Sequence, residues 1–347
     1  MATAFTQLPI LDISNLYSSD IGKRRAVAHE MGAASRDSGF FYVVGHPISR
    51  QRRDDLLAVT KAFFAQPLEQ KMACYIGKSS NHSGYVPQGE ESFYGSKPDR
   101  KEAFDISLDV SADDPDVIAA TTPFLGPVQW PDDAAFRTAV AAYYAEVAEL
   151  ARKLFAGFAL ALDMPEDWFE AHLTKPASQL RLIHYPFTTD APVDEPGIGA
   201  HTDYECFTIL LPTAPGLEVM NGLGEWIDAP PMPDAFVINI GDMIEAWTNG
   251  TFAATSHRVR KVGEERYSFP YFASCDYHTM VAPLDQFVSP ANPAKYPPMV
   301  AGDHLFAQTA QTFEYLKRRL SDGTLKLPDS SMALSSFGQE ARQRQTP

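Results

Sequence analysis

From Gln179 onward the sequence changes character, and this change restricts the possible folds more than any other feature. Short stretches rich in β-branched and aromatic residues alternate there with Gly, Pro and Asn-Gly turns. These stretches cover residues 180–186, 197–204, 207–211, 217–220, 226–228, 235–240, 257–259 and 266–269. Short strands without intervening helices predict an antiparallel sandwich or barrel rather than a Rossmann sheet. No glycine-rich phosphate loop follows a strand, so the sequence gives no support for a nucleotide cofactor.

The preceding half of the chain mixes helices with strands. The predicted strands are residues 9–13, 40–44 and 101–106, and the predicted helices are residues 19–35 and the stretch from Ser49 to about Pro67. Residues 75–99 and 109–131 predict long loops, and long loops in compact domains are often functional. From Asp132 to Phe158 apolar side chains recur at three- and four-residue steps, which predicts a long scaffold helix. A last helix is predicted over residues 304–320.

Two metal-type side chains lie close together in the stretch 197–204. His201 and Asp203 are two positions apart, and on a strand such residues project from one face. An imidazole beside a carboxylate supplies two ligands of the 2-His-1-carboxylate triad, which leaves positions open on Fe(II) for substrate and oxygen. His257, at the start of another predicted strand, can supply the third, because distant strands become neighbours in an antiparallel sandwich.

A His-x-Asp pair alone is a weak indication of a metal site, and the sequence contains rivals. Asp276 and His278 form a similar pair, but they run towards a turn with no anion-binding pattern after them. His184 lies on a predicted strand without a carboxylate at matching spacing. What favours the triad is Arg266-Tyr267-Ser268, whose guanidinium and hydroxyl share a strand face and together suit a carboxylate ligand. Taken separately, Arg266 is an ordinary exposed strand residue.

Taken together, these groups resemble the isopenicillin N synthase-like branch of the Fe(II)/2-oxoglutarate-dependent dioxygenases. The resemblance extends over most of the chain. Its further motifs are Pro9-Ile10-Leu11-Asp12, Gly39-Phe40-Phe41-Tyr42-Val43-Val44-Gly45-His46, Phe63-Phe64, Tyr185-Pro186, Asn239-Ile240-Gly241-Asp242 and Ser256-His257-Arg258-Val259. Linked motifs in this order are specific for the family and much less specific for the substrate.

The resemblance implies a mainly β fold with α: a double-stranded β-helix (jelly-roll) core with Fe(II) at its mouth. It implies that His201, Asp203 and His257 are the iron ligands. It also implies that Arg266 and Ser268 hold the distal carboxylate of 2-oxoglutarate, helped by Tyr185. The family reaction uses O2, converts 2-oxoglutarate to succinate and CO2, and oxidises a C–H bond of a small molecule.

The chain is also similar to the ethylene-forming enzyme. This similarity rests on Ser83-Gly84-Tyr85-Val86, Gly89-Glu90-Glu91, Lys97-Pro98-Asp99, Arg181 and Gly197-Ile198-Gly199-Ala200-His201-Thr202-Asp203-Tyr204. In that enzyme a glutamate loop and the tyrosine after the ligand aspartate help to hold arginine, which implies substrate contacts for Glu91 and Tyr204. Phe93 and Tyr185 depart from its pattern, so ethylene formation is the lesser alternative.

Two further residues are candidates for the pocket. Phe252 can line the substrate site, although core packing is the commoner role for such a residue. Arg181 can contact a cosubstrate carboxylate, or it can form a salt bridge within the protein, and the sequence does not separate these roles. A cationic or amine-bearing substrate near Glu91 and Tyr204 is a hypothesis at this stage.

Charge and cysteine content bear on partners and location. The formal net charge of −15 argues against nucleic acid and anionic membranes as partners. The cysteines Cys74, Cys206 and Cys275 are far apart and predict reduced thiols. The start of the chain does not resemble a signal peptide, and no apolar run reaches membrane-spanning length. We therefore expect a cytoplasmic protein, and its oligomeric state is not indicated.

We predict one compact oxygenase in three parts. Residues 1–110 form an N-terminal α/β region, residues 111–322 form the jelly-roll core with its scaffold helix, and residues 323–347 form a flexible tail. Isopenicillin N synthase and aminocyclopropane-carboxylate oxidase share the Arg-x-Ser pair without consuming 2-oxoglutarate, so an Fe(II) oxidase without this cosubstrate stays an alternative. The others are a zinc hydrolase, since three ligands and a water also suit catalytic zinc, and a non-catalytic jelly roll.

Overall fold

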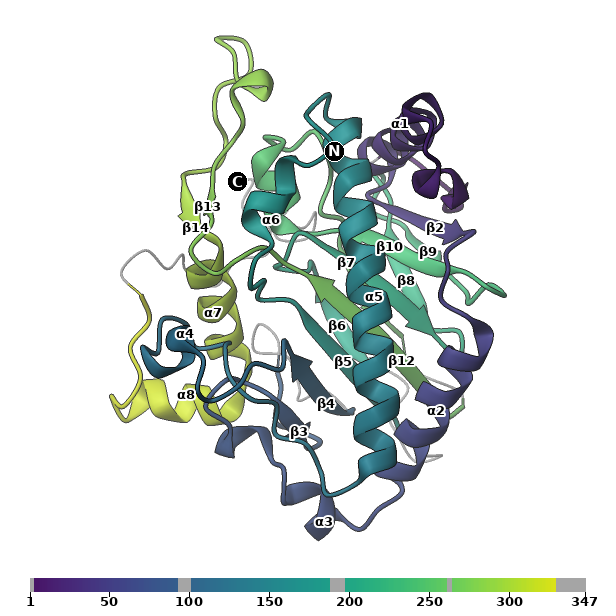
Figure 1. Cartoon of the computed structure of the whole chain (residues 1–347). Helices are drawn as coiled ribbons and strands as arrows, with labels where there is room; N and C mark the ends of the chain where they lie inside the picture. Colours follow the sequence, from purple (N-terminus) through teal and green to yellow (C-terminus); the bar gives the residue numbers. More distant parts are fainter. Residues whose placement is uncertain (1–2, 93–100, 188–196, 261–263, 329–347) are drawn as a thin grey trace.

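A computed structural model describes residues 3–92, 101–187, 197–260 and 264–328 (Figure 1). The strands are β1 Ile10–Asp12, β2 Phe40–Val44, β3 Gly84–Val86, β4 Glu102–Ser107, β5 Gln179–Tyr185, β6 Ile198–His201, β7 Phe207–Pro212, β8 Leu217–Met220, β9 Trp226–Asp228, β10 Phe236–Ile240, β11 His257–Val259, β12 Arg266–Ala273, β13 Met280–Val281 and β14 Met299–Val300. The helices are α1 Ile21–Asp37, α2 Arg50–Phe64, α3 Leu68–Met72, α4 Pro115–Ile118, α5 Ala134–Ala161, α6 Asp242–Trp247, α7 Ala301–Thr312 and α8 Glu314–Ser321.

Two sheets build the core. The large sheet has the order β1-β2-β10-β7-β12-β5-β4-β3, and the small sheet has the order β6-β11-β8-β9. Apolar side chains of β2, β7 and β10 pack against side chains of β8 in one buried cluster, so the two sheets face each other there. All pairings of neighbouring strands in these sheets are antiparallel except that of β1 with β2. The predicted fold class, a jelly-roll core with an α/β N-terminal region, is confirmed.

The N-terminal strands are part of the same large sheet as the core strands. β2 pairs with β10 at one end of the sheet, and β4 pairs with β5 near the other end. The region predicted as residues 1–110 thus contributes strands on both sides of β7 and β12. The flexible tail predicted from residue 323 falls mostly on residues 329–347, which lie outside the described residues.

The long helix α5 covers one face of the large sheet, with α1 and α2 beside it (Figure 1). The Asp133 side chain caps its first turn by accepting from the N–H groups of Ala135 and Phe136. Its apolar side chains reach the sheet: Phe155 and Phe158 both contact the ring of Phe207 on β7. α5 therefore closes one side of the sheet and leaves the other face available for a site.

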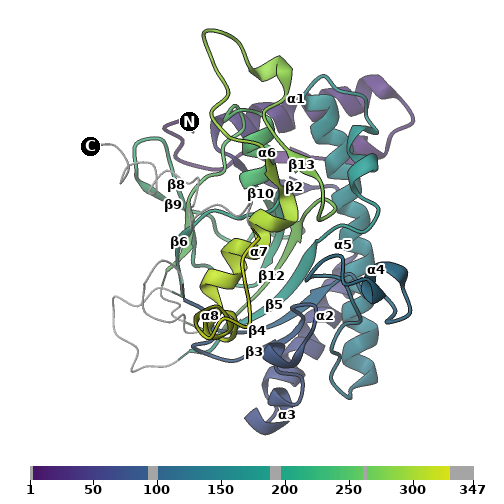
Figure 2. The same cartoon turned by 90° about the vertical axis from the view of Figure 1, so that its left-hand side faces the viewer.

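The helices α7 and α8 and the small sheet lie on the opposite side of the large sheet from α5 (Figure 2). The sequence predicts one helix over residues 304–320, but the chain forms two, because Phe313 between them has an extended backbone. The backbone of Ser92 donates to the carbonyl of Thr312, which attaches the segment after β3 to this junction. Within the described residues, no helix is both long and apolar enough to cross a membrane.

Candidate active site

His201 and His257 lie directly opposite each other in the small sheet. His201 is the last residue of β6, His257 is the first of β11, and the two are partners in the antiparallel register. Their ring centroids are 4.3 Å apart. Two residues far apart in the sequence thus meet because the strand pairing places their side chains side by side.

Asp203 reaches the same place by a different route from the one predicted. β6 ends at His201, so Asp203 lies in the turn before β7. The direction of its side chain is therefore not set by the alternation of side chains along a strand. Its carbonyl accepts the N–H of Asp242 at 2.9 Å. Its carboxylate accepts a hydrogen bond from the Thr208 hydroxyl and another, of 2.7 Å, from the Asn239 amide. Neighbouring strands therefore fix the direction of this carboxylate.

These three side chains form a cluster that can hold a metal ion. One donor atom from each of His201, Asp203 and His257 lies within 4.8 Å of the others, and Asp203 Oδ1 is 3.6 Å from each histidine Nε2. Nδ1 of His201 donates to the Gly199 carbonyl at 2.8 Å, and Nδ1 of His257 donates to the Thr255 carbonyl at 3.2 Å. Both bonds select the tautomer that presents the Nε2 lone pair to a metal. Two imidazoles and one carboxylate suit Fe(II).

The charges of these groups also fit metal binding. Burial, followed by repulsion from His257, lowers the pKa of His201 to about 4, so its imidazole is neutral near pH 7. Burial tends to raise the pKa of Asp203, but the two imidazoles and its hydrogen bonds outweigh it and keep this pKa below its usual value. A neutral imidazole and an ionised carboxylate are the forms that bind metals.

Arg266 and Ser268 lie on β12 and line the same pocket. The guanidinium of Arg266 is fully buried over the ring of Tyr185, its partner on β5, at 4.7 Å from the ring centroid. Its Nε donates to the Ala214 carbonyl at 3.2 Å, while no group of the described residues accepts from its buried Nη1. A buried guanidinium with an unused donor, near a hydroxyl, fits the carboxylate of a bound acid.

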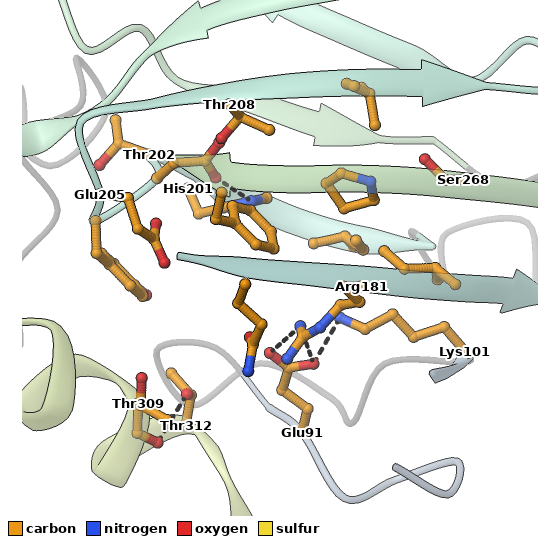
Figure 3. A pocket seen from close by; sticks show the side chains of 18 of the residues that line it. Glu91, Lys101, Arg181, His201, Thr202, Glu205, Thr208, Ser268, Thr309 and Thr312 are labelled. Carbon is orange, nitrogen blue, oxygen red and sulfur yellow. Dashed lines mark hydrogen bonds and ion pairs between the residues drawn. The ribbon is translucent and has the colours of Figure 1, made fainter. Parts of the chain in front are cut away.

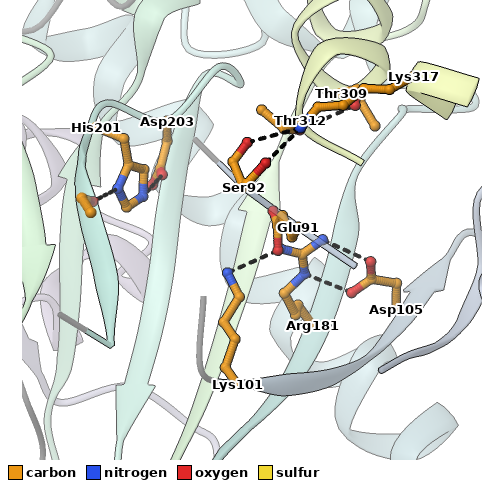
Figure 4. A network of polar contacts seen from close by, with 11 residues as sticks. Glu91, Ser92, Lys101, Asp105, Arg181, His201, Asp203, Thr309, Thr312 and Lys317 are labelled. Carbon is orange, nitrogen blue, oxygen red and sulfur yellow. Dashed lines mark hydrogen bonds and ion pairs between the residues drawn. The ribbon is translucent and has the colours of Figure 1, made fainter. Parts of the chain in front are cut away.

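Arg181 belongs to a buried group of four charges on another side of the pocket (Figure 4). It binds Asp105 through two hydrogen bonds of 2.7 and 2.8 Å, and its Nη1 lies 3.1 Å from Glu91. Lys101 Nζ is 2.8 Å from the same Glu91 carboxylate. Burial opposes ionisation of Glu91, but Arg181 and Lys101 lower its pKa to about 2. Of the two roles left open for Arg181, the structure contains the salt bridge.

The pocket extends from these groups to the C-terminal helices. Its cavity volume is about 110 Å³, and Leu305, Thr309 and Thr312 of α7 line it together with Phe313 (Figure 3). Strands of both sheets and loop residues such as Glu91 and Tyr204 supply the rest of the wall, so the metal-type cluster lines a cavity between the two sheets and α7. Such a cavity limits the access of water to a reacting centre.

Tyr204 and Glu205 follow Asp203 directly and line the pocket as well. Tyr204 is buried, and its ring contacts that of His304 on α7 edge to face. Glu205 is buried too, and burial, followed by repulsion from Asp203, raises its pKa to about 8. The sequence analysis gave a role to Tyr204 and none to Glu205.

The remaining candidates lie elsewhere. Phe252 does not line the pocket, and this expectation is corrected: its ring packs in the core against Phe158 of α5 and beneath Arg36 of α1. The carboxylate of Asp276 accepts the backbone N–H groups of the segment before β5, and His278 is exposed. His184 lies between Glu102 and Glu265, at 2.8 and 3.0 Å, in a separate polar group.

Several residues in and beside the pocket were missed because their positions depend on how distant elements pair and pack. Asp105 lies opposite Arg181 in the register of β4 and β5, which no spacing in the sequence reveals. Lys101 follows a stretch that was predicted as a loop. Thr309 and Thr312 have helical spacing but no chemical signature. Only Glu205 had a sequence signal, since it is a charged residue next to the candidate ligands in an otherwise apolar stretch.

Comparison with known proteins finds two families whose models match the chain. Residues 8–133 match the family described as non-haem dioxygenase in morphine synthesis, N-terminal, and residues 176–274 match the 2OG-Fe(II) oxygenase superfamily. The chain is 33% identical over 333 residues to the 2-oxoglutarate-Fe(II) type oxidoreductase hxnY of Emericella nidulans, which covers 91% of this chain and 94% of that protein.

A plant relative and a solved bacterial structure are similar over comparable lengths. The rice homoarginine-6-hydroxylase 2-ODD-233 is 34% identical over 333 residues, 90% of this chain and 99% of that protein. The crystal structure of a 2OG-Fe(II) oxygenase family protein from Caulobacter crescentus aligns with a TM-score of 0.75 at 30% identity, over 92% of this chain and 99% of that one. The similarities therefore cover the site and both sheets.

Proposed function

The chain belongs to the 2OG-Fe(II) oxygenase superfamily, in its isopenicillin N synthase-like class, and we propose that His201, Asp203 and His257 hold its iron. The protein is an Fe(II)- and 2-oxoglutarate-dependent dioxygenase that oxidises a small molecule. The observation that carries the ligand assignment is the cluster of two imidazoles and one carboxylate within 4.8 Å, with both histidines in the tautomer that binds metals.

When bound, Fe(II) supplies the redox chemistry that couples decarboxylation of 2-oxoglutarate to succinate with the oxidation of a substrate C–H bond by O2. The residues of the chain orient the reactants. Asn239 and Thr208 hold the carboxylate of Asp203 in place, so the ligand keeps its direction during turnover. The walls of the pocket exclude water, which protects the reactive species from side reactions.

We propose that Arg266 and Ser268 bind the distal carboxylate of 2-oxoglutarate. The unused Nη1 donor of Arg266 supports this role, because a bound carboxylate would satisfy a buried polar group that no described residue satisfies. The ring of Tyr185 packs against one face of this guanidinium. Arg181 neutralises Glu91 and does not bind the cosubstrate, because its donors already bind Asp105 and Glu91.

We further propose that the protein acts in the cytoplasm without nucleic acid or membrane as a partner. A formal net charge of −15 repels nucleic acid and anionic lipid. All three cysteines are buried free thiols, which fits a reducing compartment.

The test is succinate formation from 2-oxoglutarate with added Fe(II) and air, in a screen of small molecules. Basic amino acids come first, because the rice relative is by name a homoarginine-6-hydroxylase. Asp203→Asn should lower the rate by at least about 100-fold. His278→Ala, which alters the exposed histidine of the rival pair, should keep the wild-type rate. Equal activity of the Asp203→Asn variant would refute the ligand assignment.

A further inference from the structure

Three carboxylates line the pocket, and they differ in their partners. Asp203 belongs to the proposed iron site and accepts hydrogen bonds from Thr208 and Asn239. Glu91 is neutralised by Arg181 and by Lys101. The third, Glu205, forms no ion pair with the described residues.

Glu205 is nevertheless buried, with 7% of its surface exposed. A carboxylate removed from water is unfavourable unless a cation or several donors compensate for it. The cations nearby are already engaged, since Arg181 binds Asp105 and Glu91. The protein therefore keeps at this position a buried acidic side chain that has no cationic partner among the described residues.

The backbone holds the Glu205 side chain in the pocket. The carbonyl of Glu205 accepts the N–H of Met243 at 3.1 Å, and the next residue, Cys206, accepts the N–H of Gly241 at 2.9 Å. A side chain at Gly241 would lie 2.3 Å from the Glu205 carbonyl, so the two segments approach each other as closely as only glycine permits. In Figure 3 Glu205 lies at the same end of the pocket as Thr202, and Lys101 lies at the other end.

We propose that Glu205 binds a positively charged nitrogen of the substrate, an ammonium or a guanidinium group, and so selects cationic substrates. This inference rests on the proposed function, because the substrate must lie in the pocket above the proposed iron site. It reassigns the cation-binding role that the sequence suggested for Glu91: Glu91 already has two cationic partners within the protein, and Glu205 has none among the described residues.

The rest of the pocket suits such a substrate. Leu305 and Phe313 provide an apolar wall for the carbon chain that carries the charged group, and Thr309 adds a hydroxyl to the same lining. The formal net charge of −15 attracts cations towards the protein at low ionic strength. Because Glu205 is two residues beyond Asp203, the charged group would be held next to the proposed iron ligands.

The experiment compares pairs of ligands with and without a positive charge at the end of the side chain. L-Arginine and L-citrulline have the same shape, with a guanidinium in one and a neutral ureido group in the other, and L-lysine and L-norleucine form a second pair. Each is titrated calorimetrically into anaerobic protein loaded with Fe(II) and 2-oxoglutarate. The variants are Glu205→Gln, which removes the charge and keeps the size, and Glu149→Gln, which removes the same charge from an exposed position of α5.

We expect the wild type to prefer the cation of at least one pair by about tenfold or more, as a charge-assisted contact would provide. Glu149→Gln should keep this preference and Glu205→Gln should reduce it to about threefold or less. No preference in the wild type, or an unchanged preference in Glu205→Gln, would overturn the inference alone. Failure of the protein to bind Fe(II) and 2-oxoglutarate would overturn the proposed function, and the inference with it.

Discussion

Each of the three proposed iron ligands is held by a second group, and these groups differ in kind. Backbone carbonyls orient His201 and His257, whereas the side chains of Thr208 and Asn239 orient Asp203. A substitution cannot remove a backbone carbonyl, so the carboxylate is the ligand whose support can be tested directly. Residues that orient metal ligands typically contribute about 10- to 100-fold to metal affinity, so replacing one of them should weaken metal binding by about tenfold or more.

Thr208→Val should therefore weaken Fe(II) binding by about tenfold. The change removes the hydroxyl that donates to Asp203 and keeps a branched side chain of similar size. Anaerobic equilibrium dialysis measures the dissociation constant for Fe(II). Thr309→Val is the matched control, because this threonine also lines the pocket but lies on α7. The same loss in both variants would mean that the effect is not transmitted through Asp203.

Arg266→Lys should raise the KM for 2-oxoglutarate by about 10- to 100-fold and leave the affinity for Fe(II) unchanged. Lysine keeps the positive charge but loses the planar fork that can bind a carboxylate with two parallel hydrogen bonds. Steady-state kinetics with varied 2-oxoglutarate measures the effect. Arg260→Lys serves as the control, since that arginine is exposed and pairs with Asp228. An unchanged KM would remove Arg266 from the cosubstrate site.

The pair of strands β4 and β5 carries the buried group of Asp105, Arg181, Glu91 and Lys101. The register of β4 and β5 places Asp105 opposite Arg181. Glu91 contacts Arg181 and also pairs through its backbone with Phe313, which lies between α7 and α8. Two cations and two carboxylates leave this group neutral as a whole. It thereby ties an edge of the large sheet to the C-terminal helices that close the pocket.

Removing one charge from this group should destabilise the fold. Glu91→Gln leaves two buried cations with a single carboxylate, and we expect a loss of about 3 kcal/mol in the free energy of unfolding, measured in urea. The pKa of Glu91 is about 2 in the folded protein, below its usual 4.5. Its stabilising contribution is thus complete above about pH 5 and disappears as the pH falls towards 2.

The difference between wild type and Glu91→Gln should accordingly be constant from neutral pH to about pH 5 and shrink at lower pH. Glu149→Gln on the surface of α5 should change the free energy of unfolding by less than about 0.5 kcal/mol. If Glu91→Gln were as stable as wild type but raised the KM for substrate, Glu91 would be a substrate residue as the sequence first suggested.

Elements with a strong local pattern were predictable from the sequence, and features that depend on pairing were not. The apolar repeat from Asp132 to Phe158 predicted the long helix, and short apolar stretches predicted most strands of the jelly roll. The end of β6 at His201 was missed, because the turn that follows is held by contacts from residues 241–243. β3 was missed because it is short and is held by its pairing with β4, which the sequence does not show.

The site could be predicted only where the type of a residue indicates its chemical role. The metal-type cluster and the Arg266-x-Ser268 pair carry their chemistry in their residue types, and the fold brings both to one pocket. The partners of Arg181 and the α7 residues that line the pocket could not be predicted, because they depend on how elements far apart in the sequence pack together. The molecule as a whole explains the position of the pocket: α1, α2 and α5 cover one face of the large sheet, and the small sheet and α7 enclose the other (Figures 1 and 2).

The central claim is that one cluster binds Fe(II) and that the same pocket presents 2-oxoglutarate to it. The most direct measurement is the visible absorption spectrum of the apoprotein under anaerobic conditions, with Fe(II) and then 2-oxoglutarate added, beside a His201→Ala control. We predict a weak charge-transfer band that appears only after both additions and is missing in the control. Stoichiometric iron binding without the band would contradict the placement of 2-oxoglutarate, and a band of equal intensity in His201→Ala would contradict the iron site itself.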